Sequence, residues 1–190
     1  MNENSRPRLV AIVGLAIVGV GLSAISVAWA TLAQHLGYPV PPSLARILGR
    51  FQAGSALGIA QLVVLAPIVE EVLFRGVILR VLLWFYPATV GVVVSTAVFA
   101  VTHPNVYQFV PAALYGVVVG VLFVRTGSVM LCVWLHAAYN AALGVNPDVM
   151  SLLWRLPVLL LGVWMLRRGL FDVFPIARWR KTGVSMIDGA

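Results

Sequence analysis

Long runs of apolar residues, separated by short polar breaks, make up most of the sequence. The first run covers residues 9–30, about the length of roughly 20 residues that an α-helix needs to cross a bilayer. A longer stretch over residues 51–86 is mostly apolar but carries several charged positions. Further apolar runs follow at residues 88–102, 106–124, 128–143 and 149–166. The pattern predicts an all-α, polytopic membrane bundle of about six transmembrane helices.

The second crossing, residues 51–86, is the least regular of the six. Pro67 interrupts it, and a proline inside a helix removes a hydrogen bond and kinks the axis. We therefore expect a long, kinked and tilted helix, although two shorter crossings would also fit its length. Residues 34–50, which precede it, are rich in proline and are expected to form a loop ending in a short interfacial helix over residues 43–50.

The composition fits a membrane protein and excludes several other classes. Hydrophobic residues make up 61% of the 190 positions and charged residues only 10%. These values exclude a disordered chain, a coiled coil and a nucleic-acid-binding module, and the single cysteine excludes a disulfide scaffold. The net charge of +7 does not indicate nucleic acid, because most of the arginines flank apolar runs. We expect one transmembrane domain over residues 1–190, with membrane lipid as its surroundings.

The distribution of basic residues predicts the orientation of the chain. Cytoplasmic ends of membrane helices carry an excess of Lys and Arg. With the N-terminus inside, Arg6, Arg8, Arg80, Arg125 and the basic tail 167–190 all fall on the cytoplasmic side. Both termini are then cytoplasmic. A secretory signal peptide is the alternative for residues 9–30, but this run is longer than the about 7 to 15 apolar residues typical of one, so we expect a retained anchor.

Two adjacent acids in the second crossing are the first candidates for chemistry. Glu70 and Glu71 are the only acidic residues between positions 4 and 147. An ionisable residue within a span is expensive and indicates a functional site. Arg75 follows Glu71 by four residues, so a helix brings the two together as an ion pair, while Glu70 points about 100° away. Glu70 is then the carboxylate that can exchange a proton, although a purely structural Glu71–Arg75 pair would leave the same pattern.

Two histidines and an asparagine complete the candidate site. Glu70 and His103 each lie about 24 Å along their helices from the turn at residues 86–87, so they should meet at one depth. His136 and Asn140 are four residues apart and share a helical face, with Asn140 nearer the common depth. Alone, His103 could be a capping residue and Asn140 a helix-bridging one. Their convergence with the glutamates predicts a single polar cavity in the membrane.

These residues fall into three motifs that resemble those of a known family. The segments Glu70-Glu71-x-x-x-Arg75, Phe99-x-x-x-His103 and His136-x-x-x-Asn140 are similar, in that order, to the motifs of the CPBP (Abi, CAAX protease-like) family. That family includes the Ras-converting CAAX endopeptidases and bacterial relatives linked to bacteriocin processing and immunity. The resemblance covers a motif core of residues 67–140. It implies an intramembrane endopeptidase of the bacterial inner (plasma) membrane that cuts a membrane-associated or C-terminally anchored protein or peptide.

The resemblance also implies a role for each motif residue. Glu70 would be the general base that activates water with help from His103, and His136 and Asn140 would stabilise the oxyanion. Glu71 and Arg75 would organise the site. We expect no obligatory cofactor. A zinc-dependent route is the alternative, because Glu70, His103 and His136 match the ligand types of catalytic zinc sites, although the H-E-x-x-H motif is absent.

Two other functions fit an intramembrane cluster of this kind. A proton-coupled transporter would use the glutamates and histidines as a relay, but it predicts polar groups along a path, whereas here they gather at one level. A non-catalytic immunity or scaffold protein could keep the fold without turnover. The intact motifs favour the protease. The sequence does not identify the substrate, and in particular it shows no pocket for a prenyl group.

Overall fold

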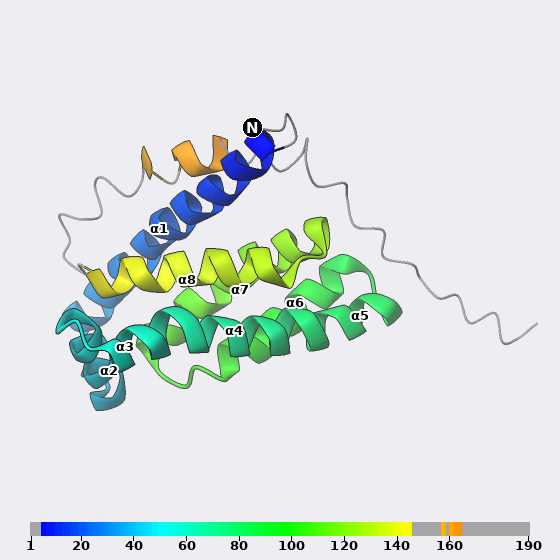
Figure 1. Cartoon of the computed structure of the whole chain (residues 1–190). Coiled ribbons are helices and arrows are strands. Elements are labelled where there is room, and N and C mark those ends of the chain that lie inside the picture. The colour runs from blue at the N-terminus through cyan, green and yellow to red at the C-terminus, as the bar shows by residue number, and fades with distance from the viewer. Residues whose placement is uncertain (1–4, 146–156, 159, 165–190) are drawn as a thin grey trace, which may run out of the picture.

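The computed structural model describes residues 5–145, 157–158 and 160–164, and in this part of the chain every regular element is a helix (Figure 1). A continuous helical rod, residues 56–85, runs through α3 (Ala56–Ile59), η1 (Ala60–Leu65), α4 (Ala66–Glu71), η2 (Val72–Leu79) and α5 (Arg80–Phe85). The elements in chain order are α1 (Ser5–His35), α2 (Pro42–Gln52), α3 (Ala56–Ile59), η1 (Ala60–Leu65), α4 (Ala66–Glu71), η2 (Val72–Leu79), α5 (Arg80–Phe85), α6 (Ala88–Val101), α7 (Val106–Thr126) and α8 (Val129–Val145).

The predicted helices over the first, third, fourth and fifth apolar runs are confirmed as α1, α6, α7 and α8. Within the described residues, α1 and α7 are long and apolar enough to cross a membrane, and α6 and α8 are shorter apolar helices. The count of six crossings stays a prediction. The last predicted crossing, residues 149–166, lies largely outside the described residues, and the basic tail 167–190 lies wholly outside them.

The predicted start of the second crossing at Phe51 is wrong, because Phe51 belongs to α2. Gly54 follows this helix with φ of 70°, a left-handed conformation that glycine adopts without strain and that ends helices. Ser55 then caps the rod by accepting a hydrogen bond from the Gly58 N–H. The predicted short helix over residues 43–50 is confirmed as α2, which has no buried residue, and its position at the membrane interface stays a prediction.

Pro67 is accommodated within the rod by a change of helical register. The Ala66 N–H donates to the carbonyl of Gln61, five residues back, as in a π-helix. In this register the carbonyl of Leu62 would accept from residue 67, but Pro67 has no N–H to give. Short π segments of this kind often occur at functional sites, because they turn side chains away from their α-helical directions.

Close helix crossings hold the rod in the bundle. Helix α1 packs along α8, and α6 packs along α7 (Figure 1). A Cβ added at Gly116 would lie 2.9 Å from a Thr96 side-chain carbon, and one at Gly120 would lie 3.0 Å from Val92. The G-x-x-x-G spacing in α7 therefore serves close helix packing, as its pattern suggests.

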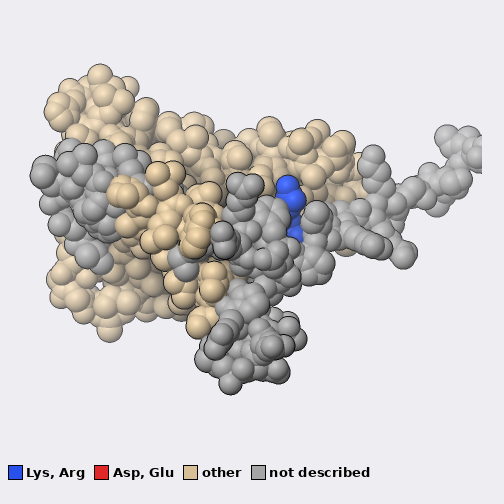
Figure 2. All heavy atoms as spheres, turned by 90° about the horizontal axis from the view of Figure 1, so that it is seen from above, with Lys and Arg blue, Asp and Glu red and all other residues tan. Residues whose placement is uncertain are grey.

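The orientation of the chain across the membrane stays a prediction. Figure 1 shows the beginning of α1, the α5–α6 turn and the α7–α8 turn toward one end of the bundle. The face in Figure 2 is almost entirely tan over the atoms it describes, with basic groups confined to one small area. Few charges on this face, together with the many exposed large hydrophobic side chains of the described helices, fit an integral membrane protein.

Candidate active site

Glu71 is the most enclosed charged group in the described structure. Its side chain has no exposed surface, and Arg75, which is 1% exposed, approaches it with Nε 3.2 Å from Oε2 and Nη1 donating to Oε1 at 3.3 Å. The predicted i,i+4 ion pair is thus confirmed. Arg75 also donates from Nη2 to the Gly116 carbonyl at 3.4 Å and places its guanidinium carbon 4.6 Å from the Phe99 ring centroid. One arginine therefore links the rod to α6 and α7.

His136 lies between the two glutamates. Its Nδ1 is 2.8 Å from Oε1 of Glu71, and its Nε2 is 3.8 Å from Oε2 of Glu70. A hydrogen bond to the carboxylate that pairs with Arg75 requires the proton on Nδ1, which directs Nε2 toward Glu70. The Glu70 side chain is 26% exposed, whereas that of Glu71 is fully buried. The two neighbouring acids thus have the different surroundings that their positions on a helix predict.

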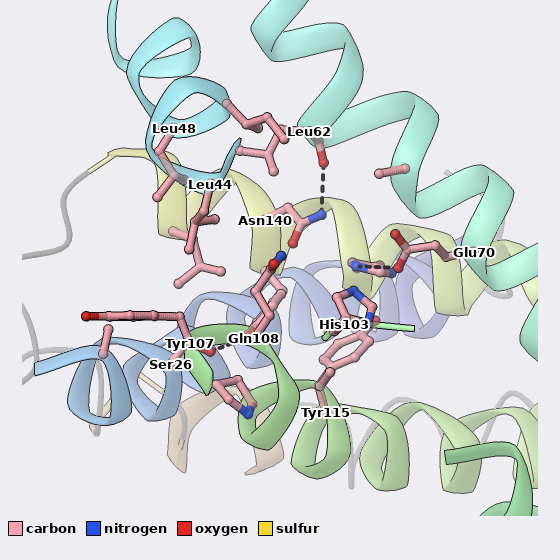
Figure 3. Close-up of a pocket in the computed structure, with 18 of the residues that line it drawn as sticks. Ser26, Leu44, Leu48, Leu62, Glu70, His103, Tyr107, Gln108, Tyr115 and Asn140 are labelled. Atoms are coloured by element: carbon pink, nitrogen blue, oxygen red, sulfur yellow. Dashed lines mark hydrogen bonds and ion pairs between the residues drawn. The ribbon is translucent and has the colours of Figure 1, made fainter. Parts of the chain in front are cut away.

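His103 lies just beyond the end of α6, on the wall of the same cavity as Glu70 (Figure 3). Its Nδ1 is 3.0 Å from the Phe99 carbonyl, and its ring lies 4.8 Å from the Phe99 ring, centroid to centroid. These contacts direct the other ring nitrogen away from the backbone of α6. The predicted common depth of Glu70 and His103 agrees with this shared cavity, but the histidine whose ring nitrogen lies 3.8 Å from the Glu70 carboxylate is His136.

Asn140 forms a hydrogen bond to a backbone carbonyl in the π-helical part of the rod. Its Nδ2 donates to the Leu62 carbonyl at 2.9 Å, as the dashed line in Figure 3 shows. This is the carbonyl that Pro67 leaves without a helical donor. The contact explains why an amide is suited to this position on α8, and it fixes the side chain at the edge of the cavity. One N–H of the Asn140 amide remains available to a substrate.

The cavity has a volume of about 620 Å³, within the range of about 300–1,000 Å³ usual for small-ligand and substrate sites. Its polar lining includes Glu70, His103, His136 and Asn140. Its remaining wall is mainly apolar and includes the inner face of α2. Figure 3 shows Leu44 and Leu48 of that helix across the cavity from Glu70.

Two cavity residues were not predicted from the sequence. Tyr115 is 3% exposed, and its hydroxyl makes no hydrogen bond; the Gln61 side-chain oxygen is also buried without one. The Tyr115 ring lies 4.8 Å from that of His136 and 4.9 Å from that of Tyr139, centroid to centroid. A single tyrosine in an apolar span does not indicate a functional site by itself. Its position in this site depends on contacts with residues of another helix.

The predicted alternative of a zinc site can be tested against the arrangement of the donors. Among the residues the structure describes, no group of three or more His, Cys, Asp or Glu side chains is placed to hold a metal ion. Nδ1 of His103 faces the Phe99 carbonyl, and Nδ1 of His136 faces Glu71. These contacts leave Nε2 of both histidines directed elsewhere, so they do not decide between a glutamate and a metal route, and the metal dependence stays a prediction.

Comparison with protein families shows what part of the chain is similar to. Residues 51–142 match the family described as type II CAAX prenyl endopeptidase Rce1-like. The matched range contains all three motifs and every candidate site residue inferred from the sequence. Neither the curated proteins nor the solved structures contain a significant match to the chain.

Proposed function

We propose that this chain, whose residues 51–142 match the family described as type II CAAX prenyl endopeptidase Rce1-like, hydrolyses a peptide bond in a membrane-associated or C-terminally anchored protein or peptide. The match to a family of membrane-embedded proteases supports endopeptidase activity and a membrane location. The substrate, the roles of the residues and the location in a bacterial plasma membrane with cytoplasmic termini are parts of the proposal.

The observation that carries the proposal is the pair of adjacent glutamates joined by one histidine. The Glu71 carboxylate contacts Arg75 and His136, and Glu70 is the carboxylate that lies on the cavity wall. Glu70 takes a proton from water, and the water oxygen forms a bond to the carbonyl carbon of the substrate. When the carbon–nitrogen bond breaks, the same proton passes from Glu70 to the departing amine. His103, on the same cavity, supports the proton transfer.

Hydrogen-bond donors around the cavity support the charge that forms on the carbonyl oxygen. Asn140 offers its second amide N–H, and His136 offers Nε2 when both ring nitrogens carry protons. The carboxylates of Glu70 and Glu71 lie on the two nitrogen sides of the ring. Each donor of this kind contributes about 3 kcal/mol to transition-state stabilisation. Glu71 and Arg75 act by positioning the imidazole.

The apolar part of the cavity supports a substrate that approaches from the membrane. Leu44, Ile47 and Leu48 place the apolar face of α2 on the cavity wall, across from the carboxylate. Apolar side chains of an extended peptide would lie against this wall while the scissile bond reaches Glu70. A water-filled polar end and an apolar side wall suit hydrolysis of a peptide whose anchor stays in lipid.

The test is mass spectrometry of the membrane and secreted peptides from cells that carry the wild type or Glu70→Gln. We expect new peptide termini that depend on the wild type and disappear in the variant. Arg46→Gln, a charge-removing change at an exposed position of α2, is the matched control and should leave those termini in place.

Other outcomes of the same comparison support other functions. A cellular phenotype that persists unchanged in a folded Glu70→Gln protein supports a non-catalytic immunity or scaffold role. Proton flux that depends on Glu70 in vesicles, without peptide cleavage, supports a transporter. Either result contradicts the proposed protease.

A further inference from the structure

Tyr115 has a buried hydroxyl without a hydrogen bond, and it lies in the wall of the cavity. Its side chain is 3% exposed, and its ring lies 4.8 Å from the His136 ring, centroid to centroid. Buried polar side chains nearly always have a partner, because an unpaired hydroxyl loses its bond to water without compensation. Tyr139, which stacks on the same ring, follows this rule, because its hydroxyl bonds to Ser26.

The position of Tyr115 is fixed by the network that positions the imidazole. Arg75, which binds Glu71, also donates to the carbonyl of Gly116, the next residue along α7. Figure 3 shows Tyr115 extending from α7 toward His103, on the same cavity as Glu70. The phenol is therefore set in place before any substrate binds, as an effective electrostatic contact requires.

The other unpaired groups of the cavity indicate what the hydroxyl would bind. Oε2 of Glu70 and the side-chain oxygen of Gln61 are buried acceptors without a hydrogen bond. Asn140 already gives one amide hydrogen to Leu62. A carbonyl oxygen that gains charge needs donors, and the Tyr115 hydroxyl is a buried donor on the cavity wall without a hydrogen bond.

We propose that the Tyr115 hydroxyl donates a hydrogen bond to the scissile carbonyl oxygen of the substrate, making Tyr115 a further catalytic residue beside His136 and Asn140. This inference rests on the proposed function. The hydroxyl gains its partner only when the peptide bond occupies the cavity. No atom is transferred to or from the tyrosine.

The test is Tyr115→Phe in the full-length protein, reconstituted in lipid vesicles with a peptide that the wild type cleaves. Phenylalanine keeps the ring against His136 and removes only the hydroxyl. We expect kcat to fall by roughly 10²-fold with KM changed by less than about threefold, the usual effect of losing one oxyanion donor. The melting temperature should stay equal or rise, because an unpaired buried group has been removed.

The matched control is Tyr139→Phe, which removes a paired hydroxyl from the adjacent ring. It should lower the melting temperature and change kcat by less than about threefold, because Ser26 loses its partner. Wild-type kcat in Tyr115→Phe would overturn the inference. A loss of activity that accompanies an equal loss of stability would also overturn it, because the role would then be structural. A wild type that cleaves no peptide would refute the proposed function itself.

Discussion

The Nδ1 atom of His136 lies 2.8 Å from Oε1 of Glu71, and this contact joins α8 to the rod at the centre of the candidate site. Glu71 is in turn held by Arg75, so the carboxylate has both a cation and an imidazole as partners. The arrangement separates two tasks between neighbouring residues. Glu71 orients the histidine, and Glu70 faces the cavity.

We therefore expect Glu71→Gln to lower stability and Glu70→Gln to abolish cleavage. Removing the Glu71 charge leaves Arg75 buried without a counter-charge, and breaking a buried pair in this way costs about 3–5 kcal/mol of stability. Glu70→Gln should abolish cleavage and change stability by less than about 1 kcal/mol, because Glu70 is partly exposed. Thermal unfolding in detergent, followed beside peptide cleavage, measures both. Equal stability of Glu71→Gln and the wild type would contradict the structural role.

Asn140 and Pro67 should be coupled in stability although they lie on different helices. Asn140→Ala leaves the Leu62 carbonyl without a donor and should cost about 1–3 kcal/mol. Pro67→Ala supplies an N–H five residues after Leu62, where the π register can use it. Asn140→Ala should therefore cost about 1 kcal/mol less in the Pro67→Ala background, as a double-mutant cycle would measure. Additive effects of the two changes would contradict this explanation.

The sequence predicted much of this site because it depends on local spacing. The Glu71–Arg75 pair follows from four-residue spacing on one helix, and the shared cavity of Glu70 and His103 follows from equal distances to one turn. The contact between Glu70 and His136 did not follow, because it depends on how α8 is rotated against the rod. Packing between distant segments sets that rotation.

The π-helical segments of the rod could not be predicted from the sequence either. Pro67 predicts a disturbed helix, but a kink and a π segment satisfy that expectation equally well. The choice depends on a donor for the freed Leu62 carbonyl, and Asn140 supplies it from a residue 78 positions later in the chain. The sequence did not predict a role for Tyr115 for a similar reason. Whether its buried hydroxyl has a hydrogen-bond partner depends on the packing of several helices.

Gly19 should be essential to the crossing that sets the position of His136. A Cβ at this position would lie 2.7 Å from the Leu135 carbonyl oxygen and 2.9 Å from the Tyr139 nitrogen, both backbone atoms of α8. Gly19→Ala should therefore move α1 from α8, lower stability by about 1–3 kcal/mol and reduce cleavage. Gly49→Ala is the matched control, since no atom lies within 4 Å of its added Cβ. Equal melting temperatures for the two variants would show that the crossing is not tight.

Chelation should leave the activity unchanged. The described His, Cys, Asp and Glu side chains do not gather into a metal-binding group, and the chemistry proposed for Glu70 needs none. Cleavage by the purified protein should therefore be the same before and after EDTA treatment and dialysis. Inactivation by EDTA that added zinc reverses would instead identify a metalloprotease and change the role of Glu70 from base to ligand or partner of a metal-bound water.

The most direct measurement of the central claim uses the purified protein in lipid vesicles with a set of synthetic lipid-anchored peptides, some prenylated and some acylated. Mass spectrometry of the products locates any cut bond. We predict that the wild type cuts an internal peptide bond near the anchor and that Glu70→Gln, folded by its melting curve, does not. Cleavage by Glu70→Gln at the wild-type rate would contradict the account.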